Sequence, residues 1–335
     1  MTKSGEKYTV RQDDAVEALL EKAAPRPVPP AEDEQRVREA VHAEWRSATG
    51  KLRTRRQFAR LAIAASVLLA VALSFNAFRE TGVEPVTVAA IDKSHGSIYR
   101  LGERSELTEV SDLATITTGQ TISTGTDSGI GLAWHGGGSL RIDAATTVEF
   151  IAIDSVFLHD GRIYFDAQAS AAAFAIETAQ ATVSHLGTQY MTAVDGPGLT
   201  VSVREGEVNI DRGRGRDTAY AGQKVELVGD AAASVTNISR SGAQWNWVEA
   251  TAPTLDFSDK STFEFLHWVS RETGLDVVFE SAEAERVARE GRLVGTIPGL
   301  DPRRELEVRM LGEDLDYVID RGRGTISVSA IEPGT

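Results

Sequence analysis

The chain has 335 residues, a formal net charge of −14 at pH 7 and no cysteine. Its length gives room for about two or three domains, and its 41% hydrophobic and 25% charged residues are typical of folded rather than disordered or polytopic membrane proteins. The negative charge argues against nucleic acid as a direct ligand, because phosphate binding needs a basic surface. The missing cysteines exclude disulfides, thiolate metal sites and a cysteine nucleophile.

Two short amphipathic stretches open the chain, at about residues 8–23 and 32–48, on either side of a proline-rich break. In the second stretch, Val37, Val41 and Trp45 are spaced four residues apart and therefore share one helical face. So small a helical pair buries too little apolar area to be stable alone. Two interpretations stay open: a loosely ordered tail, or a helix whose apolar face docks on a cytoplasmic partner.

An uncharged run of 18 residues, Leu61 to Phe78, follows. At 1.5 Å per residue it crosses most of a hydrocarbon core of roughly 30 Å. A signal peptide would begin its apolar run near the start of the chain. We therefore predict a retained transmembrane helix over residues 58–79. Five basic residues precede the run and only Arg79, beside Glu80, follows it; the five are Lys51, Arg53, Arg55, Arg56 and Arg60. The positive-inside rule then places the amino terminus in the cytoplasm.

Short alternating runs broken by glycine and aspartate occupy about Gly96 to Gly229 and predict strands and turns. The clearest runs are GSIYRL, TTVEFIAI, GRIYFDAQ, FAIET and LTVSVREGEVNI. They recur about every ten residues without an intervening helical pattern, which indicates an all-β sandwich, roll or solenoid. The segment GIGLAWHGGG lacks the lysine of a phosphate loop and is predicted to contain a hairpin turn.

The run FAIETAQATVSHLGTQYMTAV, followed by VSVREGEVNI and AGQKVEL, resembles the core of the FecR-like domain of iron dicitrate transport regulators. The residues that carry this resemblance are Leu186, Gly187, Thr188, Tyr190, Glu205, Gly206 and Val208. We interpret them as structural rather than reactive. Gly187 is expected at a bulge and Gly206 at a hairpin turn, where other residues fit the backbone poorly.

The last part of the chain alternates helical and strand patterns. We expect helices at Thr262–Glu272, ended by Gly274, at Ala282–Glu290, and from an Asp301 N-cap with Pro302 to about Leu311. The segments LDVVF, RLVGTI, DYVID and TISVSA are predicted strands, the last two forming a hairpin. This order resembles the short secretin and TonB amino-terminal domain. The resemblance implies that exposed strand edges can pair with a partner strand.

No catalytic or metal motif is found. The six histidines are scattered, and neither HExxH nor GxSxG occurs. Paired carboxylates that meet only in the fold stay possible, but nothing favours them. We therefore expect no enzyme activity, no cofactor and no metal. The predicted fold is mainly β with a C-terminal α+β module, a single transmembrane helix and a short helical cytoplasmic segment.

The predicted domains are a cytoplasmic segment (1–57), the transmembrane helix (58–79), a periplasmic FecR-like β domain (80–240) and the C-terminal module (241–335). The resemblance implies a single-pass protein of the bacterial inner membrane that relays a signal to a cytoplasmic sigma factor of the extracytoplasmic-function type. The C-terminal module would meet the signalling domain of an outer-membrane TonB-dependent receptor. The alternative is a membrane-tethered periplasmic scaffold that binds an envelope partner without controlling a sigma factor.

Overall fold

The computed structural model describes residues 84–102, 106–110, 113–167, 173–229, 231–297 and 299–331, with Glu32 and Glu39. The chain divides into two compact units, residues 1–63 and 64–335, and nearly all described residues belong to the second. The predicted membrane helix and the predicted partner-binding residues Val37, Val41 and Trp45 lie outside the described residues and remain predictions. Within the described ranges, no helix has the length and apolar character needed to cross a bilayer.

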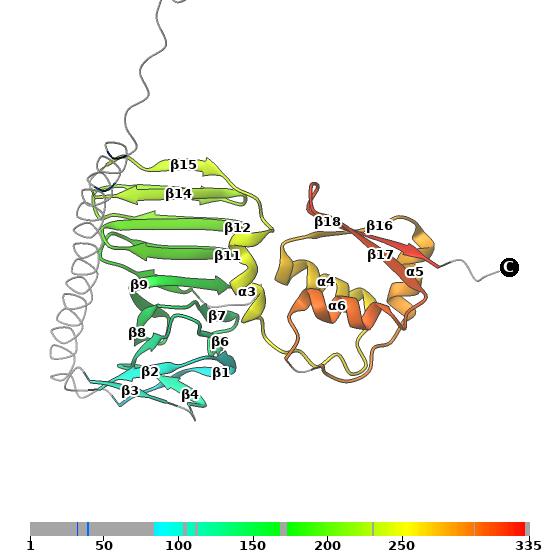
Figure 1. Cartoon of the computed structure of the whole chain (residues 1–335), viewed down its shortest axis with the longest axis horizontal. Helices are drawn as coiled ribbons and strands as arrows, with labels where there is room; N and C mark the ends of the chain where they lie inside the picture. Colours follow the sequence, from blue (N-terminus) through cyan, green and yellow to red (C-terminus); the bar gives the residue numbers. More distant parts are fainter. Residues whose placement is uncertain are drawn as a thin grey trace, which may run out of the picture. The chain divides into compact units, whose positions relative to one another are not determined.

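The described chain begins with a β-rich part (Figure 1). Its strands are β1 Thr87–His95, β2 Ile98–Leu101, β3 Leu107–Glu109, β4 Thr115–Thr117, β5 Thr121–Thr124, β6 Gly129–Trp134, β7 Ser139–Ile142, β8 Thr147–Ala152, β9 Ser155–Asp166, β10 Ala175–Glu177, β11 Thr182–Asp195, β12 Gly198–Asp211, β13 Arg216–Tyr220, β14 Gln223–Val228 and β15 Ser234–Asn237. The prediction of a mainly β fold is confirmed. The glycine-rich segment forms the turn between β6 and β7, which pair as an antiparallel hairpin.

These strands form one hydrogen-bonded sheet in the order β15-β14-β12-β11-β10-β9-β7-β6-β1-β4, with β13 on β12 and with β5 and β8 joining β2 to β9. One cluster of buried apolar side chains extends through this order from β14 to β4. It includes Val88 of β1, Ile163 of β9 and Leu227 of β14. The sheet therefore folds around one main core, and burial of that apolar surface is the main force that holds it.

Gly187 and Gly206 lie beside each other in the long β11–β12 hairpin. Gly187 has φ +65° where the pairing shifts between Leu186 and Gln189, which is a bulge. Gly206 has φ +82° but lies within β12, so its expected place in a hairpin turn is wrong. The physical reason is that β12 changes partner here, from β14 to β13, and the change of direction uses left-handed backbone, which glycine adopts readily.

The C-terminal part combines helices and strands. Its elements, after a short linker of η2 Ala243–Trp245 and α3 Asn246–Ala250, are α4 Thr262–Thr273, β16 Asp276–Phe279, α5 Ala282–Glu290, α6 Pro302–Met310, β17 Leu315–Asp320 and β18 Thr325–Ala330. The strands form a separate sheet in the order β16-β18-β17, in which β16 is parallel and β17 antiparallel to β18. Phe265, Leu306 and Ile326 belong to its own buried core.

Local sequence signals explain where the C-terminal helices begin and end. Ser261 and Glu264 form a capping box at the start of α4, and Gly274 ends that helix in left-handed backbone. Asp301 accepts hydrogen bonds from the amides of Arg303 and Arg304 at the start of α6. The predictions of all three helices, α4, α5 and α6, are confirmed. The predicted strand RLVGTI is wrong, because its described residues contain only an isolated bridge between Arg292 and Ser261.

Substitution of Gly206 by alanine should destabilise the chain more than substitution of Gly187. Left-handed backbone costs either alanine about 1–2 kcal/mol. At Gly206 a Cβ would also lie 2.5 Å from Thr188 Cγ2 and 2.9 Å from the Gly187 carbonyl oxygen, which adds about 1–3 kcal/mol of overpacking. Nothing lies within 4 Å of a Cβ at Gly187. Urea unfolding of the full chain, followed by tryptophan fluorescence, measures both variants, and equal losses would contradict this prediction.

Candidate functional site

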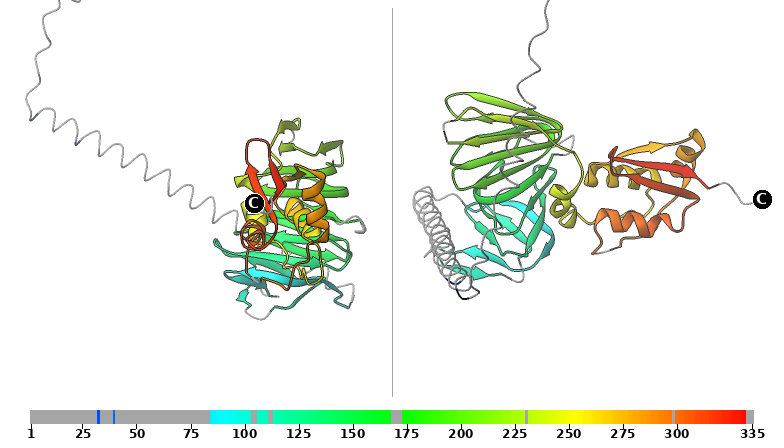
Figure 2. Two further views of the ribbon diagram at one scale, coloured as in Figure 1. Left: turned by 90° about the vertical axis from the view of Figure 1, so that its right-hand side faces the viewer. Right: turned by 45° about the horizontal axis from the view of Figure 1, so that its top comes forward.

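The end of strand β9, from Ile163 to Asp166, is buried on both faces. Ile163 and Phe165 point into the core of the β-rich part, whereas Tyr164 packs with Met191, Trp245 and Val248 in a second, smaller cluster. Asp166 lies two residues after Tyr164, on the same face of the strand, and is only 4% exposed. Because alternate residues of a strand face opposite sides, the outer face of this part of the sheet is covered rather than solvated. The linker helices and α4 provide the cover, as Figure 2 also shows for α3.

A buried ion pair crosses from the sheet to α4. Arg141 of β7 is fully buried and Glu272 of α4 is 3% exposed, and Arg141 Nη2 lies 2.6 Å from Glu272 Oε2. The same guanidinium donates from Nη1 to the carbonyl oxygen of Val248 in α3, at 2.8 Å. Arg141 therefore binds the linker and the C-terminal part at once.

A second ion pair lies beside the first. Asp166 accepts a hydrogen bond from Arg271 Nε at 3.1 Å, and Arg271 Nη2 also donates to the Ala167 carbonyl oxygen, at 3.1 Å. The Gln189 amide nitrogen of β11 lies 3.1 Å from Asp166 Oδ2 and 3.2 Å from the Arg271 carbonyl oxygen. Arg271 and Glu272, which are adjacent in α4, thus both have their partners on the sheet.

Arg204 of β12 completes this set without a carboxylate in direct contact. Its Nε and Nη1 donate to the carbonyl oxygens of Arg240 and Glu272, each at 2.9 Å. Its guanidinium lies 4.4 Å from the ring centroid of Trp245 and 5.6 Å from that of Tyr164, which is cation–π geometry. A buried charge is tolerated here because backbone dipoles and aromatic faces replace water.

We call Arg141, Asp166, Gln189, Arg204, Arg271 and Glu272 the junction network. The network brings the end of α4 close to β12, and the backbone at Gly274 packs tightly against Arg204 and Arg240. A Cβ at Gly274 would overlap the carbonyl oxygen of Arg240 and lie 3.0 Å from Arg204 Nε. Glycine therefore ends the helix and also lets the backbone approach β12.

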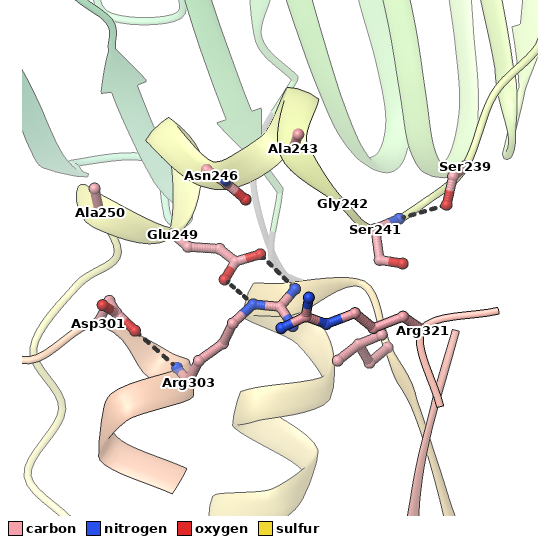
Figure 3. Close-up of a pocket in the computed structure, with 11 residues that line it drawn as sticks. Ser239, Ser241, Gly242, Ala243, Asn246, Glu249, Ala250, Asp301, Arg303 and Arg321 are labelled. Atoms are coloured by element: carbon pink, nitrogen blue, oxygen red, sulfur yellow. Dashed lines mark hydrogen bonds and ion pairs between the residues drawn. The ribbon is translucent and has the colours of Figure 1, made fainter. Parts of the chain in front are cut away.

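Another ion pair joins the linker to α6. Glu249 of α3 is 4% exposed, and its two carboxylate oxygens accept from Arg303 Nε and Nη2 at 2.6 and 2.9 Å. This two-bond geometry fixes the planes of both groups. Figure 3 shows the pair at the edge of a pocket beside α3.

Burial sets the electrostatics of the junction network. Loss of hydration raises the pKa of the Glu272 carboxyl, and the neighbouring Arg141 opposes that shift by stabilising the carboxylate. Burial likewise raises the pKa of Tyr164. Breaking only one ion pair of the network therefore destabilises the fold, because the charge that loses its partner remains buried away from water.

The residues that carry the FecR resemblance flank two members of the network. Thr188, Tyr190 and Val208 are buried, and Glu205 is exposed. Leu186 lies in β11. Gln189 lies inside the LGTQY motif, and Arg204 directly precedes Glu205 and Gly206. The bulge and bend at the two glycines therefore sit next to the side chains that reach α4.

The junction network was not predicted from the sequence. Its members lie far apart in the chain: Gln189 and Arg271 are separated by 82 residues, and Asp166 and Arg271 by 105. One signal was available. In GRIYFDAQ, Ile163 and Phe165 alternate with Tyr164 and Asp166. The aromatic Tyr164 on the second face indicates that this face is also covered.

The FecR protein family model matches residues 120–209. The chain carries a FecR domain. The matched residues run from β5 into β12, and they include all four members of the junction network that the sheet contributes, namely Arg141, Asp166, Gln189 and Arg204. The FecR domain thus supplies one complete side of the contact with α4.

Other comparisons add little to this. No curated protein matches the chain. Two crystal structures of a candidate anti-sigma factor from Parabacteroides distasonis are similar. The first is 17% identical and covers 63% of this chain and 98% of its own, with a TM-score of 0.34. The second is 16% identical and covers 62% and 97%, also with a TM-score of 0.34. These scores are below the level that indicates a shared fold.

Loss of either partner of the Arg141–Glu272 pair should destabilise the chain strongly. Arg141→Met or Glu272→Met leaves one buried charge without its partner, which costs about 3–5 kcal/mol. The double variant should recover much of this loss, because it removes both charges and leaves apolar side chains in their place. The free energy of unfolding in urea, measured for the full chain, tests both statements.

A matched control is Arg286→Met on α5, where both ion pairs are exposed; it should leave the unfolding midpoint nearly unchanged. A loss for Arg141→Met no larger than that of the control would show that the pair does not hold the FecR domain to α4.

The FecR domain should lose stability as the pH falls from 7 to 5, in part through His185. Burial lowers the pKa of His185 below its ordinary value of 6.5, and its Nδ1 accepts the Gly187 amide at 3.2 Å. The unfolded state therefore binds more protons in this range. The contribution of His185 is fully present above pH 6.5 and is lost as the pH falls through the folded pKa.

Urea unfolding at several pH values should give a shallower pH dependence of the unfolding free energy for His185→Asn. His135→Asn, at an exposed turn, serves as control. An unchanged slope in His185→Asn would contradict the assignment.

Proposed function

We propose that the chain is a transmembrane signalling regulator of the FecR type, an anti-sigma factor that relays an extracytoplasmic signal by protein–protein interaction. The observation that carries the proposal is the FecR match over residues 120–209. FecR domains belong to regulators rather than to a class of enzymes. Binding is then the whole mechanism, with no catalytic step and no cofactor.

The junction network supports a relay. A regulator that receives its signal at a C-terminal module needs a mechanical connection from that module to the rest of the chain. Here α4 is joined to the FecR domain by Arg141–Glu272, Asp166–Arg271 and the Arg204 contacts. A displacement of α4 has to move the strands as well or break buried contacts, and a buried charge without its partner is costly.

The sequence supplies the other half of the proposal. Residues 58–79 would cross the inner membrane, with residues 1–57 in the cytoplasm and residues 80–335 in the periplasm. The face of Val37, Val41 and Trp45 would hold a sigma factor of the extracytoplasmic-function type. The partner of the C-terminal module would be the signalling domain of an outer-membrane TonB-dependent receptor, whose strand could add to an exposed edge such as β17.

Charged residues on the proposed sigma-binding face should abolish partner capture. A full chain tagged at its C-terminus and solubilised in detergent should recover a sigma factor from its own cells. The triple variant Val37→Asp, Val41→Asp, Trp45→Asp should recover none, because three carboxylates cannot be buried in an apolar groove. Mass spectrometry of the recovered proteins measures the difference.

A matched control places the same three aspartates on the opposite helical face, as Gln35→Asp, Ala43→Asp and Ser47→Asp. This control should keep the sigma factor. Recovery of no sigma factor by an intact wild-type chain would reject the anti-sigma proposal and leave the periplasmic scaffold. Equal recovery by both triple variants would place the interface elsewhere.

A further inference from the structure

A pocket of about 550 Å³ lies beside α3 (Figure 3). Its walls come from the segment after β15, from α3, from the start of α6 and from the turn between β17 and β18. The volume falls within the range of about 300–1,000 Å³ that is usual for small-ligand sites. The charged groups that line it are Glu249, Asp301, Arg303 and Arg321.

Both carboxylates in the pocket already have partners. Glu249 uses each of its oxygens on Arg303. Asp301 accepts from the amides of Arg303 and Arg304 through Oδ1, and its Oδ2 lies 3.8 Å from Arg304 Nε. Neither acid is therefore available to neutralise a further cation.

Arg321 differs from these groups. It is exposed on the turn between β17 and β18, and among the described residues its guanidinium has no hydrogen bond and no ion pair. In Figure 3 its side chain points to the same part of the pocket as that of Arg303. Ser241 and Asn246 also line the pocket, and each has a side-chain donor. The pocket thus offers an uncommitted cation and polar donors, with no uncommitted acid.

We propose that this pocket binds a carboxylate-bearing ligand, with Arg321 as its principal charged contact. A guanidinium presents parallel N–H groups that match the two oxygens of a carboxylate. Counting Glu249, Asp301, Arg303, Arg304 and Arg321 as ionised gives three positive and two negative charges, so the local excess is a single positive charge. On a chain with a net charge of −14, such a site would select an anion that the rest of the surface repels. This site goes beyond the proposed function and does not depend on it.

The carboxylate could belong to a free organic acid or to an acidic side chain of a polypeptide. Two probes separate these sources: glutarate, a free dicarboxylate, and the peptide acetyl-Ala-Glu-Ala-amide. Glutaramide, which has the same carbon chain without charge, tests the need for a carboxylate. Ligand-detected NMR titration of the purified full chain measures binding of each probe.

Arg321→Gln should weaken binding of the active probe by about tenfold or more, since it removes the one uncommitted charge. It should leave folding unchanged, because the replaced guanidinium forms no hydrogen bond or ion pair with a described residue. Arg323→Gln is the matched control: Arg323 belongs to the same turn, has an 84% exposed side chain and lies near Asp320. This variant should bind like wild type.

Each outcome decides the proposal. Glutarate binding that Arg321→Gln alone weakens supports a free acid as ligand. Binding of the peptide alone, with the same dependence on Arg321, supports a carboxylate supplied by a polypeptide. Binding of neither probe, equal binding of glutaramide, or equal binding by Arg321→Gln would overturn the proposal.

Discussion

The buried ion pair between Arg141 and Glu272 is the constraint on which the rest of the second unit depends. The two side chains are at most 3% exposed. They are stable as ions only while they face each other, since either one alone would carry the free-energy cost of its desolvation without compensation. Strand β7 and helix α4 must therefore keep their positions. The Tyr164 ring, whose centroid lies 5.1 Å from the Arg141 guanidinium, and the Val248 carbonyl oxygen, which accepts a hydrogen bond from it, pack against this pair.

The FecR domain meets this constraint with strands that are buried on both faces. One face of β9 builds the main core, and the other carries Tyr164 and Asp166 toward the linker and α4. The bulge at Gly187 and the bend at Gly206 adjust the neighbouring strands so that Gln189 and Arg204 reach the same place. Residues that look purely structural in the sequence thus position the contact between two parts of the chain.

This arrangement suits a protein that acts by binding. The C-terminal part has its own core around Phe265, Leu306 and Ile326, yet its first helix is tied to the FecR domain by charged contacts that hold only at short range. Such contacts resist small displacements and fail together, because the loss of one partner leaves the other buried without compensation. The Glu249–Arg303 pair adds a second tie at the linker, at the wall of the pocket that Arg321 also lines.

The sequence by itself determined those features that depend on neighbouring residues. Alternation predicted the strands, and the capping residues Ser261, Gly274 and Asp301 marked the ends of helices, because these signals act within a few residues. It misplaced Gly206 and predicted a strand at RLVGTI, since a bend within a strand and a missing strand partner are both decided by what lies across the sheet. Only the tertiary structure brought Arg141 to Glu272 and Asp166 to Arg271. The reason is that the local sequence around a charged residue on a strand does not show whether its side chain is exposed to solvent or buried. Only the fold determines which distant group pairs with it when it is buried.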